Sequence, residues 1–324
     1  MRELTFVDAL TEGLREEMHR NPNVILMGEE IGVFGGAYKV TRGLLEEFGP
    51  ERVRDTPISE IAIVGASIGA ALAGLKPVAE LMYMDFIPIA LDQISTQAAK
   101  ARFMSGGALK VPMVIRTQYS LGRVHGSQHS QFFPSWFFQM PGIKVVLPST
   151  PYDAKGLLIS AMRDENPVVF VECGLLYRSK GPVPEEEYTI PLGVADVKRT
   201  GTDITVVAFS RLVQEALKAA EKLQERGVSV EVVDPRTVQP LDLSTIVNSV
   251  KKTGRLVVAA DDIKTGGLGA EISAAIVEEA FDYLDAPVAR VACPPIPVPF
   301  SPSLEEAYMP NSDKIVNSCT AILG

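Results

Sequence analysis

The 324-residue sequence is poor in the residues that mark disulfide frameworks and metal centres, with only three cysteines and three histidines. The cysteines are odd in number and far apart, so they form no CxxC pair and suit a reducing cytosol. Basic residues are also in the minority, because 31 Lys and Arg face 40 Asp and Glu and give a net charge of −9. That balance disfavours nucleic acid and anionic membranes as partners.

Long hydrophobic runs are missing as well. The longest apolar run covers residues 61–75, whereas a bilayer-spanning helix needs about 20 such residues. The N-terminal stretch MRELTFVDALTEGLREEMHR is acidic and amphipathic, without the apolar core of a secretory signal peptide. We therefore expect no membrane association, a cytoplasmic location, and a buried helix at 61–75.

The common phosphate-binding motifs and the zincin motif do not occur. There is no Walker A sequence, GxGxxG or HExxH, so zincins find no support. The stretch TGGLGAEI at 265–272 places glycines before a helix, where an anion could bind. Because the full fingerprint is lacking, close packing of a strand on a helix is the favoured interpretation.

What the sequence does contain is an alternation of short apolar strands and amphipathic helices in both halves. Helical spacing predicts a first helix over 6–18, and Thr150 with Pro151 marks the start of another helix that Pro167 is expected to end. Strands are expected at 23–28, 77–81, 112–116, 144–148, 167–172, 203–209, 228–234, 255–261 and 287–293.

This alternation predicts an α/β protein of two layers in tandem, each with a parallel sheet covered on both faces. The stretch 174–200 is rich in Pro, Gly and Glu and separates the halves. We place the domains at 1–185 and 186–324.

Two groups of residues are candidates for chemistry. Glu60 opens the apolar helix in TPISE, where its carboxylate could stabilise the helix N-terminus or act as a general acid or base. His125 and His129 lie in RVHGSQHSQ. Their spacing of four would suit a metal pair on a helix, but the flanking glycines favour a loop. His129 is then either a structural loop residue or a catalytic one.

Read in order, several segments resemble one known family. They are GEEIGVFGGAYKVTRGL, RDTPISEIAIVGASIGAALAGLKPVAELM, QAAKARFMSGG, QHSQ, PGIKVVLPSTPYDAKGLL and, in the second half, VVDPRTVQPLD and GGLGAEI. Together they strongly resemble the β subunit of the E1 component of 2-oxo acid dehydrogenase complexes. The resemblance implies a transketolase-like pyrimidine-binding module followed by a smaller C-terminal α/β transketolase domain.

The resemblance also implies a thiamine diphosphate reaction. A 2-oxo acid would be decarboxylated on the cofactor, and its acyl group would pass to a lipoyl arm of the E2 component. Glu60 matches the carboxyl group that hydrogen-bonds ring nitrogen N1′, Phe86 the aromatic that stacks on the pyrimidine, and Ile58 a residue contacting that ring. Glu29 matches an acid of a proton relay, and His129 the histidine that serves substrate and acyl transfer. His125 matches no functional position.

Partners and ions follow from the same resemblance. The GDG…N motif that binds diphosphate and Mg²⁺ in this family is missing here, so an α subunit would supply it within an α2β2 tetramer, with the helix at 61–75 near the interface.

The turn AMRDENP matches one that binds potassium in some members, the alternative being a helix end capped by its own side chains. The ion ligands would be Met113, Ala161, Met162, Asp164 and Asn166.

Substrate identity is where the sequence departs from the family pattern. Gln139 stands where many members have histidine, and TQYSLGRVHGS differs from the small-residue loop of pyruvate enzymes. GAYKVTRGL and MSGG resemble the pyruvate type, whereas AELMYMDFI and VIRTQY resemble the β subunit of acetoin dehydrogenase. We expect pyruvate as the substrate, with acetoin or branched-chain 2-oxo acids as the alternatives.

Overall fold

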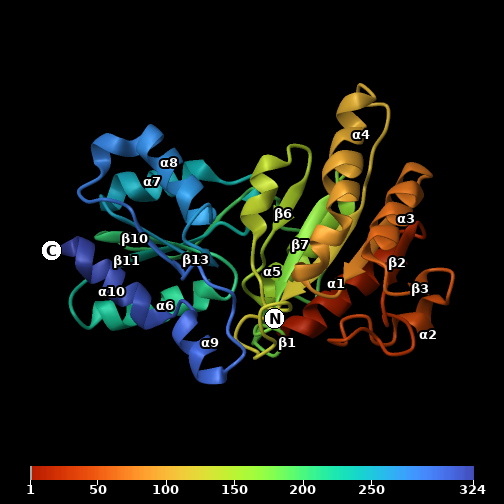
Figure 1. Ribbon diagram of the computed structural model, residues 1–324, viewed down its shortest axis with the longest axis horizontal. Coiled ribbons are helices and arrows are strands. Elements are labelled where there is room, and N and C mark those ends of the chain that lie inside the picture. Colours follow the sequence, from red (N-terminus) through yellow and green to blue (C-terminus); the bar gives the residue numbers. More distant parts are fainter. Residues whose placement is uncertain (1) are drawn as a thin grey trace. The chain divides into compact units, whose positions relative to one another are not determined.

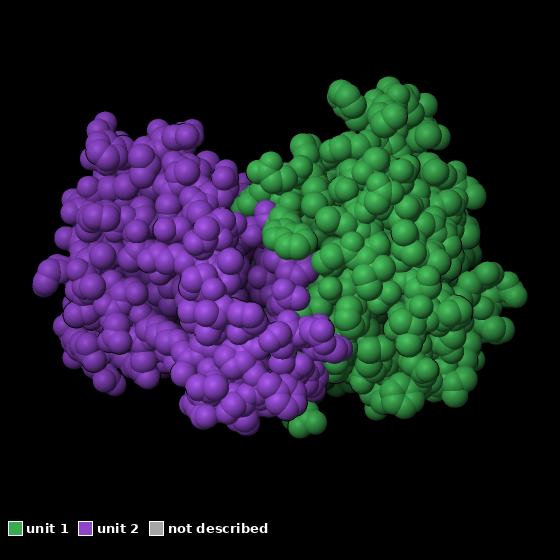
Figure 2. Space-filling view, viewed as in Figure 1, with its two compact units in different colours: residues 1–120, 136–192 green, residues 121–135, 193–324 purple. Residues whose placement is uncertain are grey.

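The structure is a computed structural model that describes residues 2–324 and divides into two compact units (Figures 1 and 2). Unit 1 comprises the residues up to 120 together with 136–192. Unit 2 comprises 121–135 together with 193–324. Segment 121–135, which contains His125 and His129, therefore packs with the second half of the chain.

Unit 1 is built around a parallel sheet with the strand order β6-β7-β5-β4-β2-β3. Its strands are β2 (Val24–Gly28), β3 (Val53–Asp55), β4 (Lys76–Leu81), β5 (Val114–Tyr119), β6 (Lys144–Val146) and β7 (Val168–Cys173). Its helices are α1 (Phe6–Arg20), α2 (Leu44–Phe48), α3 (Glu60–Leu72), α4 (Ala99–Met104), α5 (Pro151–Arg163), the 3₁₀ helix η1 (Met84–Ala90) and the π-helix η2 (Gln93–Ala98). Strands β1 (Arg2–Thr5) and β8 (Lys180–Val183) form a separate antiparallel pair.

The helix at 151 begins as the sequence predicts but ends earlier. The Thr150 hydroxyl accepts a hydrogen bond from the Asp153 backbone N–H, and Pro151 takes the first helical position, where its missing N–H costs nothing. The helix stops at Arg163 because Asp164 adopts an extended conformation with ψ 150°. Pro167 is therefore not what ends it.

The expectation of a buried helix at 61–75 is wrong in its bounds and in part of its burial. Helix α3 ends at Leu72, and Gly74 turns the chain with φ +97°, a conformation that favours glycine. One face packs on β4 and η1, but Ile61 and Leu72 on the other face are 47% and 44% exposed. The apolar run thus supplies one buried face and one open apolar face.

Unit 2 holds a sheet with the order β14-β13-β10-β11-β9. The first four strands in that order run parallel, and β9 adds an antiparallel edge that the sequence did not predict. Helices α6 and α10 cover one face and α7 and α8 the other (Figure 1). The elements are β9 (Asp196–Arg199), β10 (Ile204–Ala208), α6 (Leu212–Gln224), β11 (Val230–Asp234), β12 (Thr237–Gln239), α7 (Leu243–Thr253), β13 (Leu256–Ile263), α8 (Leu268–Ala280), the 3₁₀ helix η4 (Phe281–Tyr283), β14 (Ala289–Cys293), α9 (Pro302–Tyr308) and α10 (Ser312–Leu323).

The glycine-rich stretch before α8 serves packing. The carboxylate of buried Asp262 accepts the backbone N–H of Leu268 in the first turn of α8. A Cβ at Gly267 would lie 2.4 Å from the Ile263 carbonyl oxygen and 2.6 Å from the Asp262 carboxyl carbon. The chain's own carboxylate thus meets the helix N-terminus where an external anion would bind, which favours the packing interpretation of TGGLGAEI.

Asp262 makes the stability of unit 2 depend on pH. Burial, with Asp261 alongside, raises the pKa of Asp262 to about 7, so the folded chain holds a proton that the unfolded chain has released. We expect the free energy of unfolding to fall as pH rises from about 4 to about 7, by up to about 4 kcal/mol from this group. Asp262→Asn, which keeps an oxygen for Leu268, should not show this fall.

The measurement is urea unfolding of both proteins at a series of pH values. The difference in unfolding free energy between Asp262→Asn and the parent chain should grow through that window and then level off. A difference that is independent of pH would contradict this role of Asp262.

Candidate active site

The parallel sheet of unit 1 brings three of the candidate residues to one edge. Glu29 directly follows β2, Glu60 follows β3 as the first residue of α3, and Phe86 lies in η1 directly after β4. Strands β3, β2 and β4 are neighbours and run parallel, so their carboxyl ends lie at the same edge. That edge is where open α/β sheets bind ligands.

Glu60 is buried at the start of α3, with only 5% of its surface exposed. The backbone of the first turn is closed by the Ser59 carbonyl, which accepts the N–H groups of Ala62 and Ile63 at 3.0 and 2.9 Å. Within residues 2–324, no side chain or backbone group donates a hydrogen bond to the Glu60 carboxylate. A buried carboxyl group without such a donor is suited to bind a polar group of a ligand.

Glu29 lies close enough to Glu60 for the two carboxylates to repel each other. Burial raises the pKa of Glu29, and the negative charges of Glu60 and Glu80 raise it further. Its Oε1 atom is buried and has no hydrogen-bond partner among the described residues. Glu29 is thus a carboxyl group with a raised pKa beside a second buried acid, an arrangement suited to proton transfer.

A buried ion-pair network supports this edge, and sequence reasoning missed it. Arg116 on β5 donates from Nη1 to Glu80 Oε2 at 2.6 Å. It also binds Glu172 on β7 with two bonds, from Nε at 2.7 Å and from Nη2 at 3.0 Å. The Tyr177 hydroxyl donates to Glu172 Oε2 at 2.8 Å. The available signal was an arginine inside the strand VIRTQY, because a charged residue in a buried strand needs a buried counter-charge.

Phe86 and Ile58 differ in their surroundings. The Phe86 ring stands edge-on to the Tyr83 ring, with 5.6 Å between the centroids. Ile58, two residues before Glu60, is 83% exposed, so this large apolar side chain is available to a ligand or a partner beside the buried acid. Contact of both residues with a pyrimidine ring stays a prediction.

The histidines lie in a loop, as the flanking glycines indicate, and not on a helix. Residues 121–133 contain no helix or strand, and Gly126 adopts φ +72° with the position of a Cβ only 2.8 Å from the Phe300 ring. Burial, together with the nearby charges of Arg123 and His129, lowers the pKa of His125. Because the loop contains no helix, His125 and His129 do not share a helix face, which removes the basis for a metal pair. Among the described residues no group of three or more His, Cys, Asp and Glu could hold a metal ion.

Glu305 on α9 holds this histidine loop in place. Its carboxylate accepts the backbone N–H of Gly122 at 2.9 Å and that of Val124 at 2.8 Å. Val124 has φ 61°, which is unfavourable for a β-branched residue. Two bonds to one buried carboxylate thus stabilise a strained backbone at Val124, five residues before His129. Nothing in the sequence pattern pointed to Glu305.

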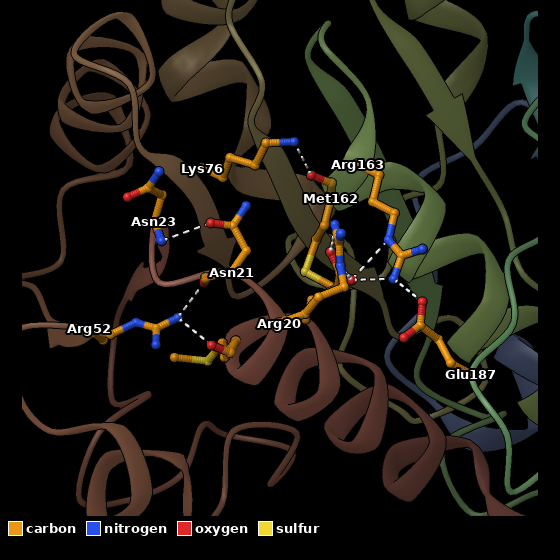
Figure 3. A network of polar contacts seen from close by, with 10 residues as sticks. Arg20, Asn21, Asn23, Arg52, Lys76, Met162, Arg163 and Glu187 are labelled. Atoms are coloured by element: carbon orange, nitrogen blue, oxygen red, sulfur yellow. Dashed lines mark hydrogen bonds and ion pairs between the residues drawn. The ribbon is translucent and has the colours of Figure 1, made fainter.

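The turn after α5 carries the oxygen atoms expected to bind potassium, and cationic side chains already contact several of them. Figure 3 shows the contact of Lys76 with Met162. Lys76 Nζ donates to the Met162 carbonyl at 3.2 Å, and Arg102 donates to Asn166 Oδ1 at 2.9 Å. Burial alone would raise the pKa of Asp164, but the Lys144 ammonium and the Asn166 N–H hold it below its usual range. The oxygens are of the kind potassium prefers, so an ion would share them with these side chains.

Two protein-family models match the chain. The model for the transketolase pyrimidine binding domain covers residues 2–180, and that for the transketolase C-terminal domain covers residues 193–315. A solved structure titled "Split gene transketolase, inactive beta4 tetramer" is similar in fold, with a TM-score of 0.81 at 22% identity over 99% of this chain and 98% of the other. None of the described helices is long and apolar enough to cross a membrane.

Curated relatives are similar over nearly the whole chain. The acetoin:2,6-dichlorophenolindophenol oxidoreductase subunit beta of Bacillus subtilis is 45% identical, covering 100% of this chain and 98% of the relative. The pyruvate dehydrogenase E1 component subunit beta-1 of Arabidopsis thaliana is 47% identical, covering 98% and 88%. The 2-oxoisovalerate dehydrogenase subunit beta of Bacillus subtilis is 46% identical, covering 97% of each.

The hydrogen bonds of Glu305 generate a test of the histidine loop. Glu305→Ala removes both acceptors and leaves two backbone N–H groups in the loop unpaired. We therefore expect the free energy of unfolding, measured in urea, to fall by about 2–4 kcal/mol. Glu306→Ala, an exposed neighbour on the same helix, is the matched control and should change stability by less than about 0.5 kcal/mol. Equal effects of the two variants would show that Glu305 does not anchor the loop.

Proposed function

Because this chain belongs to the transketolase-like E1 β subunits of 2-oxo acid dehydrogenase complexes, we propose that it decarboxylates pyruvate and passes the acetyl group to the lipoyl domain of an E2 component. Membership of this family rests on relatives that are more than 40% identical to this chain over nearly its whole length. The cofactor of transketolase-like enzymes is thiamine diphosphate, which when bound stabilises the carbanion left by decarboxylation.

The proposal rests on one observation, the burial and the hydrogen bonding of the Glu60 carboxyl group. Its carboxyl group is buried at the carboxyl edge of the sheet and accepts no hydrogen bond from the described part of the chain. Such a group fits a ring nitrogen that offers a hydrogen bond in a dry site, where the bond is strengthened by the low dielectric. In our proposal Glu60 binds N1′ of the cofactor's pyrimidine, Phe86 stacks on that ring and Ile58 contacts it.

Glu29 and His129 complete the proposed roles of this chain. Glu29, whose pKa is raised by burial and by the neighbouring acids, acts as a relay for protons entering or leaving the site. His129, in the loop anchored by Glu305, serves the substrate and acyl-transfer steps. A loop on a rigid support suits a residue that must meet an incoming lipoyl group.

An α subunit is the partner that completes this site. The chain has no GDG…N motif, so in our proposal the α subunit binds the diphosphate and Mg²⁺ within an α2β2 tetramer. The open apolar face of α3 supports this assembly, because Ile61 and Leu72 are exposed and nothing lies within 4 Å of a Cβ placed at Gly69. A second backbone can approach such a face closely.

The proposal also includes a potassium site and a cytoplasmic location. Potassium at the turn after α5 would bind oxygens of Met162, Asp164 and Asn166 alongside Lys76 and Lys144, with the carbonyls of Met113 and Ala161 as its remaining ligands. A cytoplasmic location suits the cysteines, since Cys173, Cys293 and Cys319 are few, far apart and buried, as is typical of proteins in a reducing compartment.

Acetoin is the second candidate substrate. The segments AELMYMDFI and VIRTQY favour it, and the acetoin enzyme subunit is about as similar to this chain as the pyruvate enzyme subunits are. Both reactions would use the same cofactor and the same Glu60. Turnover with a dye acceptor, measured separately for pyruvate, acetoin and 2-oxoisovalerate, distinguishes the candidates, and we expect the highest kcat/KM for pyruvate.

Glu60→Gln is the direct test of the shared chemistry. In the enzyme reconstituted with its α subunit, thiamine diphosphate and Mg²⁺, we expect kcat to fall by about 100-fold or more with every substrate, because the amide cannot exchange a proton with N1′. Glu46→Gln, an exposed acid on α2, is the matched control. A Glu60→Gln enzyme that turns over at the parent rate would remove the basis of the proposal.

Gly69→Trp tests the proposed α-subunit face. The position is open in the isolated chain, so the chain should fold with nearly unchanged stability, but the large ring should block close approach of a partner. We expect the variant to lose the α subunit in size-exclusion chromatography with light scattering. Glu221→Trp, on the exposed face of α6, should assemble normally, and equal assembly of the two variants would place the interface elsewhere.

A further inference from the structure

A chain of hydrogen bonds leads from the end of β5 to the aromatic ring next to Phe86. The Ser120 hydroxyl donates to Gln118 Oε1 at 2.9 Å, and Gln118 Nε2 donates to the Tyr38 hydroxyl at 3.1 Å. The Tyr38 hydroxyl then donates to the Tyr83 hydroxyl at 2.6 Å. Three segments distant in sequence are joined in this way: the end of β5, the loop between β2 and α2, and the link between β4 and η1.

The chain of hydrogen bonds ends beside Phe86, the residue proposed to contact the cofactor. Tyr83 is the residue just before η1, and its ring stands edge-on to Phe86 at 5.6 Å between centroids. An edge-to-face pair is a favoured geometry whose energy depends on the angle between the rings. Fixing the Tyr83 hydroxyl therefore fixes the surface against which Phe86 rests.

Tyr38 is braced on its other side by the buried ion-pair network. Its ring packs against that of Tyr177 at 5.2 Å between centroids, and the Tyr177 hydroxyl binds Glu172, which Arg116 holds with two bonds. Gln118 is almost fully buried. A buried amide with both ends bonded has a single favourable orientation, so it presents its N–H to Tyr38 in a fixed place.

We propose that Tyr38 is a positioning residue for the cofactor, acting through the Tyr83 hydroxyl to hold the Phe86 ring in the orientation that stacks on the pyrimidine. The inference rests on the proposed function, which assigns the pyrimidine contact to Phe86. It also gives a shared role to Tyr83 and Gln118, which lie in AELMYMDFI and VIRTQY, the two segments that resemble the β subunit of acetoin dehydrogenase. These segments thus carry two members of one hydrogen-bonded chain behind the cofactor.

The test uses Tyr38→Phe, Tyr83→Phe and the double variant in the enzyme reconstituted with its α subunit. Each change keeps the ring and removes one hydroxyl, so packing is preserved. We expect the KM for thiamine diphosphate to rise about 2- to 10-fold, the effect of one buried neutral hydrogen bond, with kcat at saturating cofactor within twofold of the parent. Because both hydroxyls form the same bond, the double variant should be no worse than Tyr38→Phe alone.

Tyr188→Phe is the matched control. This tyrosine also donates a hydrogen bond, to the Tyr152 carbonyl at 2.8 Å, but it is not a member of the hydrogen-bond chain that leads to Tyr83. Its cofactor KM should not change. A purely structural role of Tyr38 would lower the melting temperature without cofactor and leave the cofactor KM unchanged, and that result would overturn the inference. Independent effects that multiply in the double variant would also overturn it.

Phe86→Ala distinguishes a failure of the inference from a failure of the proposed function. If Phe86→Ala raises the cofactor KM while Tyr38→Phe and Tyr83→Phe do not, Phe86 contacts the cofactor without help from the hydroxyl pair, and only the inference is wrong. If Phe86→Ala leaves the cofactor KM unchanged, the assignment of Phe86 in the proposed function is wrong and the inference falls with it.

Discussion

Arg116 is the cation on which the acidic edge of unit 1 depends. Glu29, Glu60 and Glu80 lie near one another at the carboxyl ends of neighbouring strands, and Glu172 lies behind them in β7. Carboxylates brought together in an apolar environment repel each other and lose hydration, at a cost of several kcal/mol per ion. Arg116 forms ion pairs with both Glu80 and Glu172, so one cation offsets part of the negative charge at this edge.

These ion pairs explain why the acids can differ in role although they share one edge. Glu80 and Glu172 are bound to a guanidinium and act as structural groups. Glu29 has an elevated pKa and a buried oxygen without a partner among the described residues. Glu60 keeps its carboxyl group available at the start of an apolar helix. Environment, and not residue type, separates the supporting acids from those suited to chemistry.

The sequence predicted the parts of the fold that follow from local periodicity. It located most strands and helices and singled out Glu60, and the family resemblance added Glu29 and Phe86. Their positions at one edge follow from the parallel order of β3, β2 and β4, and their roles stay predictions. The sequence could not indicate the packing of 121–135 with the second half or the anchoring of that loop by Glu305, because these depend on residues more than 180 positions apart. It placed the apolar helix near an interface but could not indicate which face of α3 stays open, since an apolar run does not tell a core from a docking surface.

The central claim is that one buried carboxyl group of this chain binds the pyrimidine ring of a cofactor held largely by another subunit. The most direct measurement is a crystal structure of the chain assembled with its α subunit, thiamine diphosphate and Mg²⁺. The account predicts a Glu60 oxygen at hydrogen-bond distance, about 2.5–3.2 Å, from the ring nitrogen N1′. A Glu60 side chain directed into solvent, with the ring bound elsewhere, would contradict it.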